Sequence, residues 1–358
     1  MPRYILLVFL IACGGGPGCG SRSETAHSET PSLPEPTAPS PIQSVNEWGL
    51  VSVGPRGVEL AAGPGTQQLS LQQVFTIDKP VLYVHASAPT SLHVEVTPGE
   101  GMSVAEHFPH VAGPLVWNVE VTPGECTTPR DYTGSCNSTD GYCETHELAL
   151  YETSDADCLT QGELNVPLLF YRLRADDEPA MPLSVDGGNE NEVVLFNTGL
   201  EAGASIWRVT WDGAQAHATR AVAPAAGEQL VIQRAVQGGV VDVRAAIRQD
   251  LAGLGLTRHE AEAFMRAWDS ALFGAQGSID GELADEDGTP TDIPVRDIDS
   301  LTSDETILDR RVIPGAPRVT DAILYWLPAA HIEAMSALTF RPAPQVVHRA
   351  ILVRVDAR

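Results

Sequence analysis

The sequence has little positive charge. Of 358 residues, 22 are lysine or arginine and 47 are aspartate or glutamate, so the formal net charge is −25. Lys79 is the single lysine. Such a surface repels the phosphates of nucleic acids and the headgroups of anionic lipids. The composition therefore argues against a nucleic-acid partner and predicts no polybasic patch for membrane binding.

The sequence also lacks the short motifs of common catalytic and cofactor sites. It contains no G-x-S-x-G, H-E-x-x-H, P-loop or G-x-G-x-x-G pattern. His259-Glu260 is not followed by the second histidine of a zinc motif, so we expect these residues to begin a helix. The sequence assigns no catalytic residue and no cofactor, and it favours a protein that is not an enzyme.

The N-terminus has the features of an export signal. Arg3 precedes an apolar run over residues 4–12, which is far shorter than the roughly 20 residues of a membrane-spanning helix. Leu10-Ile11-Ala12-Cys13 resembles the lipobox of bacterial lipoproteins, which implies diacylation of Cys13 and a membrane partner reached through that lipid. Gly14, in place of aspartate, implies the outer membrane by the same resemblance. The alternative is an ordinary secretory signal that is cleaved nearby.

The body is predicted to be mainly β, with antiparallel, sandwich-like layers. Short runs such as 92–96, 116–121, 192–197 and 205–211 are rich in strand-forming residues, and Gly or Pro separates them. The predicted organisation is a signal peptide (1–12), a Pro/Ser/Thr-rich tether (13–44), a β-sandwich-like domain (45–125), a cysteine-rich loop (126–160), a second β-domain (161–238), a helical hairpin (239–274), an acidic insert or loop (275–320) and C-terminal strands (321–358).

The helical hairpin is predicted from periodicity. Apolar residues spaced by three or four positions form one stripe in each helix. The first stripe is Val243, Ile247, Leu251 and Leu254, and the second is Ala261, Phe264, Met265, Trp268 and Leu272. Thr257 and Glu260 form a capping-box pattern at the start of the second helix. This makes the C-terminal end of the chain α+β.

Four cysteines lie close together in the middle of the chain: Cys126, Cys136, Cys143 and Cys158. In an exported chain such a cluster predicts two disulfides, and three pairings are possible. A zinc site is the alternative, but the spacing contains no C-x₂₋₄-C pair.

Two groups of residues suggest metal binding only weakly. Asp285, Asp287 and Asp292 resemble part of a calcium loop, but the glycine and the final glutamate of an EF-hand are not in place. A solvated acidic loop is the expected alternative. A second group, of histidines on or near predicted strands, consists of His85, His93, His107 and His110. Such residues commonly serve packing or lie on the surface, so we assign no metal.

Several motifs together resemble a family of uncharacterised exported proteins from myxobacteria and similar GC-rich bacteria. These motifs are Asn46-Glu47-Trp48-Gly49, Lys79-Pro80-Val81, Leu169-Phe170-Tyr171-Arg172, the helix from Glu260 to Trp268, Tyr325 to Pro328, and Pro342-Ala343-Pro344. The resemblance implies export and a similar architecture, with residues 275–320 as an insert. It implies no particular activity.

Two functions remain open. The first is a binding or structural module at the cell envelope, with an unknown protein or glycan as partner. The second is an exported hydrolase with an unrecognised, carboxylate-based site.

Overall fold

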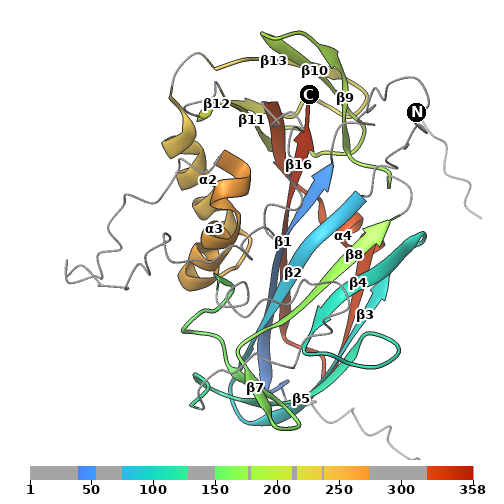
Figure 1. Cartoon of the computed structure of the whole chain (residues 1–358), viewed down its shortest axis with the longest axis vertical. Coiled ribbons are helices and arrows are strands. Elements are labelled where there is room, and N and C mark those ends of the chain that lie inside the picture. Colours follow the sequence, from blue (N-terminus) through green and yellow to red (C-terminus); the bar gives the residue numbers. More distant parts are fainter. Residues whose placement is uncertain are drawn as a thin grey trace, which may run out of the picture. The chain divides into compact units, whose positions relative to one another are not determined.

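The largest part of the body is an eight-stranded sheet, which we call the central sheet (Figure 1). The structure is a computed structural model, and it describes residues 39–53, 75–127, 150–175, 179–211, 216–235, 238–273 and 321–357. From edge to edge, the strands are β12 (Ala216–Val222), β11 (Ser205–Trp211), β14 (Asp321–Trp326), β16 (Val346–Asp356), β1 (Ile42–Val53), β2 (Phe75–Ala86), β8 (Leu169–Ala175) and β4 (Met102–Phe108).

Strands β1 and β16 are neighbours in the middle of the central sheet and run parallel. The other pairs given for this sheet are antiparallel. Successive side chains of a strand point to opposite faces, so Asn46 and Trp48 lie on one face of β1 and Glu47 on the other. All three are buried, which shows that both faces of the sheet are covered here. The predicted mainly-β fold is confirmed.

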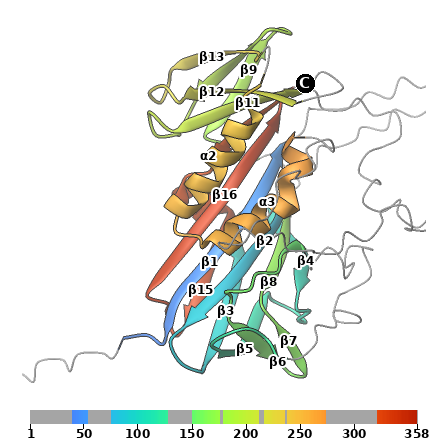
Figure 2. The ribbon, with the colours of Figure 1, turned by 90° about the vertical axis from the view of Figure 1, so that its left-hand side faces the viewer.

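The predicted helical hairpin covers one face of the central sheet (Figure 2). It consists of α2 (Val240–Gly253) and α3 (Arg258–Phe273). Trp48 of β1 meets Phe264 of α3 edge to face, with 5.5 Å between ring centroids. The predicted stripes are buried, except that Leu254 is 37% exposed at the end of α2 and Trp268 is partly buried.

The opposite face of the central sheet contacts a second, five-stranded sheet. Its order is β15 (Ser336–Arg341), β3 (Thr90–Pro98), β5 (Val116–Thr122), β6 (Cys158–Gln161) and β7 (Leu164–Val166). The short helix α4 (Ala329–Met335) leads into β15. The hydroxyls of Tyr171 in β8 and Ser336 are hydrogen-bonded at 2.9 Å, which joins the two sheets.

A third, three-stranded sheet is attached to the central sheet through Arg208. Its order is β13 (Gln229–Gln233), β10 (Glu192–Asn197) and β9 (Leu183–Gly188). Arg208 of β11 donates to the carbonyl oxygens of Asn191 and Ile232 at 2.9 and 2.8 Å. These hydrogen bonds therefore connect the central sheet to the three-stranded sheet.

The structure divides the chain differently from the sequence prediction at two places. Strand β1 begins at Ile42, which is fully buried, so the tether ends before this residue and not at 44. Strands from 45–125, 161–238 and 321–358 share the central sheet, and the chain from Pro39 onwards belongs to one compact unit. Strands that are distant in sequence thus pair within one sheet, although the composition of the chain suggested separate domains.

The predicted signal peptide, most of the predicted tether and the predicted acidic insert lie outside the described residues. Within the part of the chain that the structure describes, no helix is both long and apolar enough to cross a bilayer.

Candidate functional site

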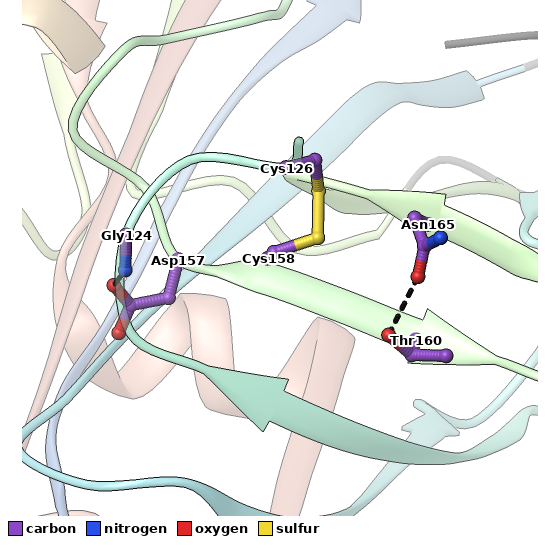
Figure 3. Close-up of a disulfide and its surroundings, with 6 residues drawn as sticks. All are labelled: Gly124, Cys126, Asp157, Cys158, Thr160 and Asn165. Atoms are coloured by element: carbon purple, nitrogen blue, oxygen red, sulfur yellow. Dashed lines mark hydrogen bonds between the residues drawn. A yellow bond between two sulfur atoms is a disulfide. The ribbon is translucent and has the colours of Figure 1, made fainter. Parts of the chain in front are cut away.

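A disulfide between Cys126 and Cys158 closes the connection from β5 to β6 (Figure 3). Beside it, Asp157 accepts hydrogen bonds from the backbone N–H groups of Gly124, at 2.7 Å, and Ala86, at 2.5 Å. One predicted disulfide is therefore present, and its pairing is the one that joins the first and last cysteines of the cluster. Cys136 and Cys143 lie outside the described residues, so a second disulfide within this cluster would have to join them to each other.

Replacing Cys126 and Cys158 together by serine is expected to lower the free energy of unfolding by about 2–5 kcal/mol. The bond spans a sequence separation of 32 residues, and its removal frees the unfolded chain to explore more conformations. Urea unfolding of both proteins measures the difference. The matched control replaces Cys136 and Cys143, for which the sequence predicts a second disulfide that would close a shorter loop. An equal loss in both variants would contradict the structural role given to the Cys126–Cys158 bond.

Residues 150–157, which we call the return arm, lead from the cysteine-rich loop back to Cys158. The Tyr83 hydroxyl donates to the Tyr151 carbonyl at 2.5 Å, and the Asp157 N–H donates to the Val84 carbonyl at 3.1 Å. Arg266 of α3 donates to the Glu152 carbonyl at 2.7 Å. Both β2 and α3 therefore hold the arm.

Beside the return arm, a histidine on β2 contacts a buried carboxylate of α3. His85 Nε2 lies 2.9 Å from Glu260 Oε1. The Asn46 amide donates to both oxygens of Glu260, at 3.1 and 2.8 Å. The Thr257 N–H also donates to Glu260, at 2.8 Å, and the Glu260 N–H donates to the Thr257 hydroxyl. The predicted capping box is therefore confirmed, and its carboxylate also connects α3 to β1 and β2.

Acidic groups around His85 favour its protonated form. Burial lowers the pKa of His85, but the hydrogen bond and negative charge of Glu260 raise it, and Asp155 and Asp157 add to this effect. The net result is a pKa above the usual value. A second histidine, His259, is more exposed to solvent, and its Nδ1 lies 3.5 Å from Asp155 Oδ2. We call His85, Asp155, Asp157, His259 and Glu260 the arm–hairpin cluster.

A histidine held by a buried carboxylate is an arrangement that can orient a general base. Among the described residues, His85 hydrogen-bonds Glu260 alone. Within the same residues, no group of three or more His, Cys, Asp or Glu side chains is placed to hold a metal ion. The cluster therefore has acid–base character, but among the described residues His85 hydrogen-bonds no hydroxyl or thiol that could act as a nucleophile.

The four histidines considered for metal binding do not come together at one place among the described residues. His93 of β3 pairs with Asn118 at 2.9 Å. His107 stacks on His110 with 5.1 Å between centroids, and burial lowers the pKa of His107. The calcium candidates Asp285, Asp287 and Asp292 lie outside the described residues, as does Cys13.

A second buried polar network joins the central sheet to β15. Glu47 is fully buried and accepts hydrogen bonds from Tyr171, at 2.6 Å, and from Arg349. Arg349 also donates to the Ser336 carbonyl at 2.7 Å. Burial raises the pKa of Tyr171, and the charge of Glu47 raises it further. This network lies between layers, so we assign it to stability.

Sequence reasoning predicted a role for only a few residues of these two networks. Glu260 was expected as a helix cap and His85 as a weak metal candidate. Asn46 and Glu47 entered only through a motif. The available signal was the presence of two adjacent polar residues between apolar neighbours in the middle of strand β1.

Comparisons with protein families, with curated proteins and with solved structures found no match for this chain. The fold and the site define a mainly-β protein with a helical hairpin, a disulfide-closed loop and a histidine–carboxylate cluster beside that loop.

Proposed function

We propose that this chain is an extracytoplasmic lipoprotein of the outer membrane, anchored through Cys13, that acts as a binding or structural module. In this proposal the β-layers form a rigid body that presents the loop closed by the Cys126–Cys158 disulfide. Binding residues are commonly carried by loops on a rigid scaffold. The folded body starts at Ile42, which leaves a spacer between it and the proposed anchor.

The observation that carries the proposal is the disulfide. Structural disulfides persist in oxidising compartments and are rare in the cytosol. The lipobox pattern before Cys13 and the resemblance to exported bacterial proteins support the same compartment. Because the net charge is −25, the partner we expect is a cationic protein surface or a neutral glycan and not a nucleic acid.

Replacing Cys13 by serine tests the anchor. The wild-type chain should fractionate with membranes and incorporate radiolabelled palmitate, because two acyl chains hold a protein stably at a bilayer. The Cys13→Ser variant should lose both properties. The matched control, Cys19→Ser, should keep both. A wild-type chain that takes no label, or a Cys13→Ser variant that stays membrane-bound, would overturn the proposed anchor.

The His85–Glu260 pair favours a second candidate, an exported hydrolase. In that case His85 would act as a base oriented by Glu260. Chromogenic ester and glycoside substrates distinguish the two candidates. Turnover by the wild-type protein that is lost in His85→Gln and kept in His93→Gln would favour the hydrolase. No turnover in any of the three would favour the binding module.

A further inference from the structure

Strand β13 forms one edge of the three-stranded sheet and pairs with β10 on its inner side. The Asn197 N–H donates to the Glu228 carbonyl at 3.0 Å, and the Arg234 N–H donates to the Asn191 carbonyl at 2.6 Å. Positions 228 and 234 thus direct their backbone groups towards β10. Because successive residues of a strand direct these groups to opposite sides, the odd-numbered residues of β13 direct theirs to the open edge.

The odd-numbered residues of β13 are Gln229, Val231 and Gln233, and all three are exposed. Val231, at the centre, is 50% exposed. In the part of the chain that the structure describes, no second strand pairs with this edge. The N–H and C=O groups of these residues therefore form a row that another strand can bind through backbone hydrogen bonds.

The other edge strands of the three sheets carry features that hinder pairing with another chain. β9 has an irregular register with β10 and carries Asp186, and β4 has an irregular register with β8 and carries Glu106. β12 carries Arg220, β15 ends at Arg341, and β7 has three residues. Charges, bulges and short length are the usual protections of a sheet edge. β13 has neither a charge nor a bulge.

The sequence of this strand and its two flanking residues is self-complementary. Positions 228–234 read EQLVIQR. In an antiparallel pair of two copies centred on Val231, each Val231 faces the other and Gln229 faces Gln233. The aliphatic positions 230 and 232 also face each other, and at both ends Glu228 of one copy faces Arg234 of the other. Opposite charges and aliphatic residues that face each other across a strand pair stabilise it.

Charge favours this edge over other surfaces for contact between two copies. With a formal net charge of −25, two copies of the chain repel each other over most of their surfaces, but the ends of β13 offer one charge of each sign. Within one chain, Glu228 Oε2 accepts from the Ala225 N–H at 3.2 Å, and Arg234 Nη2 lies 3.5 Å from the Trp211 carbonyl. Both contacts are with backbone groups, which an opposite charge can replace.

We propose that β13 is a homodimer interface, at which two copies of the chain pair antiparallel about Val231 and join their three-stranded sheets into one. The pair has a two-fold axis at Val231, so both copies use the same residues. Because the contact is short, the dimer is weak and reversible. The inference rests on this sheet edge and does not depend on Cys13 or on the function proposed above.

The place of β13 in the fold leaves the disulfide-closed loop accessible in such a dimer. The three-stranded sheet lies at the end of the body away from β5 and β7, as Figure 1 shows. The Cys126–Cys158 disulfide closes the connection from β5 to β6, at that other end. Pairing through β13 therefore covers neither of the two loops.

Sedimentation equilibrium of the full chain carrying Cys13→Ser, the parent chain, tests the dimer without a contribution from lipid. The apparent mass should rise with concentration towards that of two chains. Adding Val231→Lys should raise the dissociation constant roughly tenfold or more, because two like charges then meet at the symmetry axis. The matched control, Val241→Lys, changes a valine of α2 that is 77% exposed, and it should leave the dissociation constant unchanged. A parent chain that stays monomeric at every concentration overturns the proposal, as does equal association of the Val231→Lys variant.

Charge exchange tests the antiparallel register. Glu228→Arg alone brings two arginines together at each end of the pair, and Arg234→Glu alone brings two glutamates together. Each variant should therefore associate roughly tenfold more weakly than the parent chain, or worse. An equimolar mixture of the two should regain the dimer, since every end of the mixed pair again joins opposite charges. A mixture that associates no better than either variant alone contradicts the proposed pairing.

Hydrogen exchange of the parent chain at low and high concentration tests the interface without a substitution in β13. The amides of Gln229, Val231 and Gln233 should become protected at high concentration, because their N–H groups enter the new strand pair. The amides of Leu230 and Ile232, which face β10, should change much less. Association that leaves the odd-numbered amides unprotected would place the interface elsewhere and refute the proposal.

Discussion

Replacing Arg349 by methionine is expected to lower the free energy of unfolding by about 3–5 kcal/mol. The Arg349 side chain is 11% exposed, and Glu47, to which its Nε donates, is fully buried. The substitution leaves the carboxylate of Glu47 in the sheet interior with the Tyr171 hydroxyl but without a positive charge. A charge that is buried without its partner is costly because it has lost its hydration. Urea unfolding near pH 7 measures the loss.

The control uses the other ion pair of the same arginine. Glu333 lies 3.1 Å from Arg349 Nη1, but its side chain is 61% exposed, so Glu333→Gln should cost less than about 1 kcal/mol. Replacing both buried partners, with Glu47→Leu and Arg349→Met, should restore part of the loss. If Arg349→Met lowers the free energy of unfolding by no more than Glu333→Gln does, burial does not determine the strength of the Arg349–Glu47 pair.

Replacing Asp321 by asparagine is expected to cost a similar amount, about 3–5 kcal/mol. Arg208 is fully buried and donates to the two oxygens of Asp321 at 2.9 and 2.6 Å. Without the carboxylate, the guanidinium keeps its carbonyl acceptors but loses its counter-charge. Because Ile232 lies in β13 and Asn191 directly precedes β10, hydrogen exchange in β10 and β13 should increase together with the loss of global stability.

A matched comparison is available in the helical hairpin. Arg248 and Glu262 form a pair at 3.2 Å, with side chains 34% and 24% exposed. Glu262→Gln should lower stability by less than about 1 kcal/mol, because water can replace the lost contact. Similar losses in Asp321→Asn and Glu262→Gln would show that Arg208 does not join the two sheets energetically.

Local sequence patterns predicted the secondary structure well where the physical signal is strong. Strands β10 and β11 have the bounds that were predicted, because turn residues flank compact runs of apolar and β-branched residues. The hairpin helices follow from a period of 3.6 and a capping box. Strands β4 and β12 were missed, since their sequences, MSVAEHF and AHATRAV, contain few large apolar residues. Their pairing with β8 and β11 makes them strands.

The arrangement of the sheets and the site could not be predicted in the same way. Asn46 and Glu260 are 214 residues apart, and His85 and Glu260 are 175 apart. Periodicity identifies a strand or a helix, but it carries no information about which distant segment lies beside it. The capping pattern identified Glu260 correctly, while its contacts to β1 and β2 depend on the tertiary fold.

The parallel pairing of β1 with β16 has a consequence for biosynthesis. Glu47 and Arg349, which face each other across this pair, are separated by 302 residues. At roughly 5–20 residues per second, a ribosome takes about 15–60 s to make the intervening chain. Until β16 emerges, β1 lacks one of its two neighbours and the core of the body cannot close. A nascent chain in this condition has no completed fold to unravel, which would ease the export that we propose for this chain.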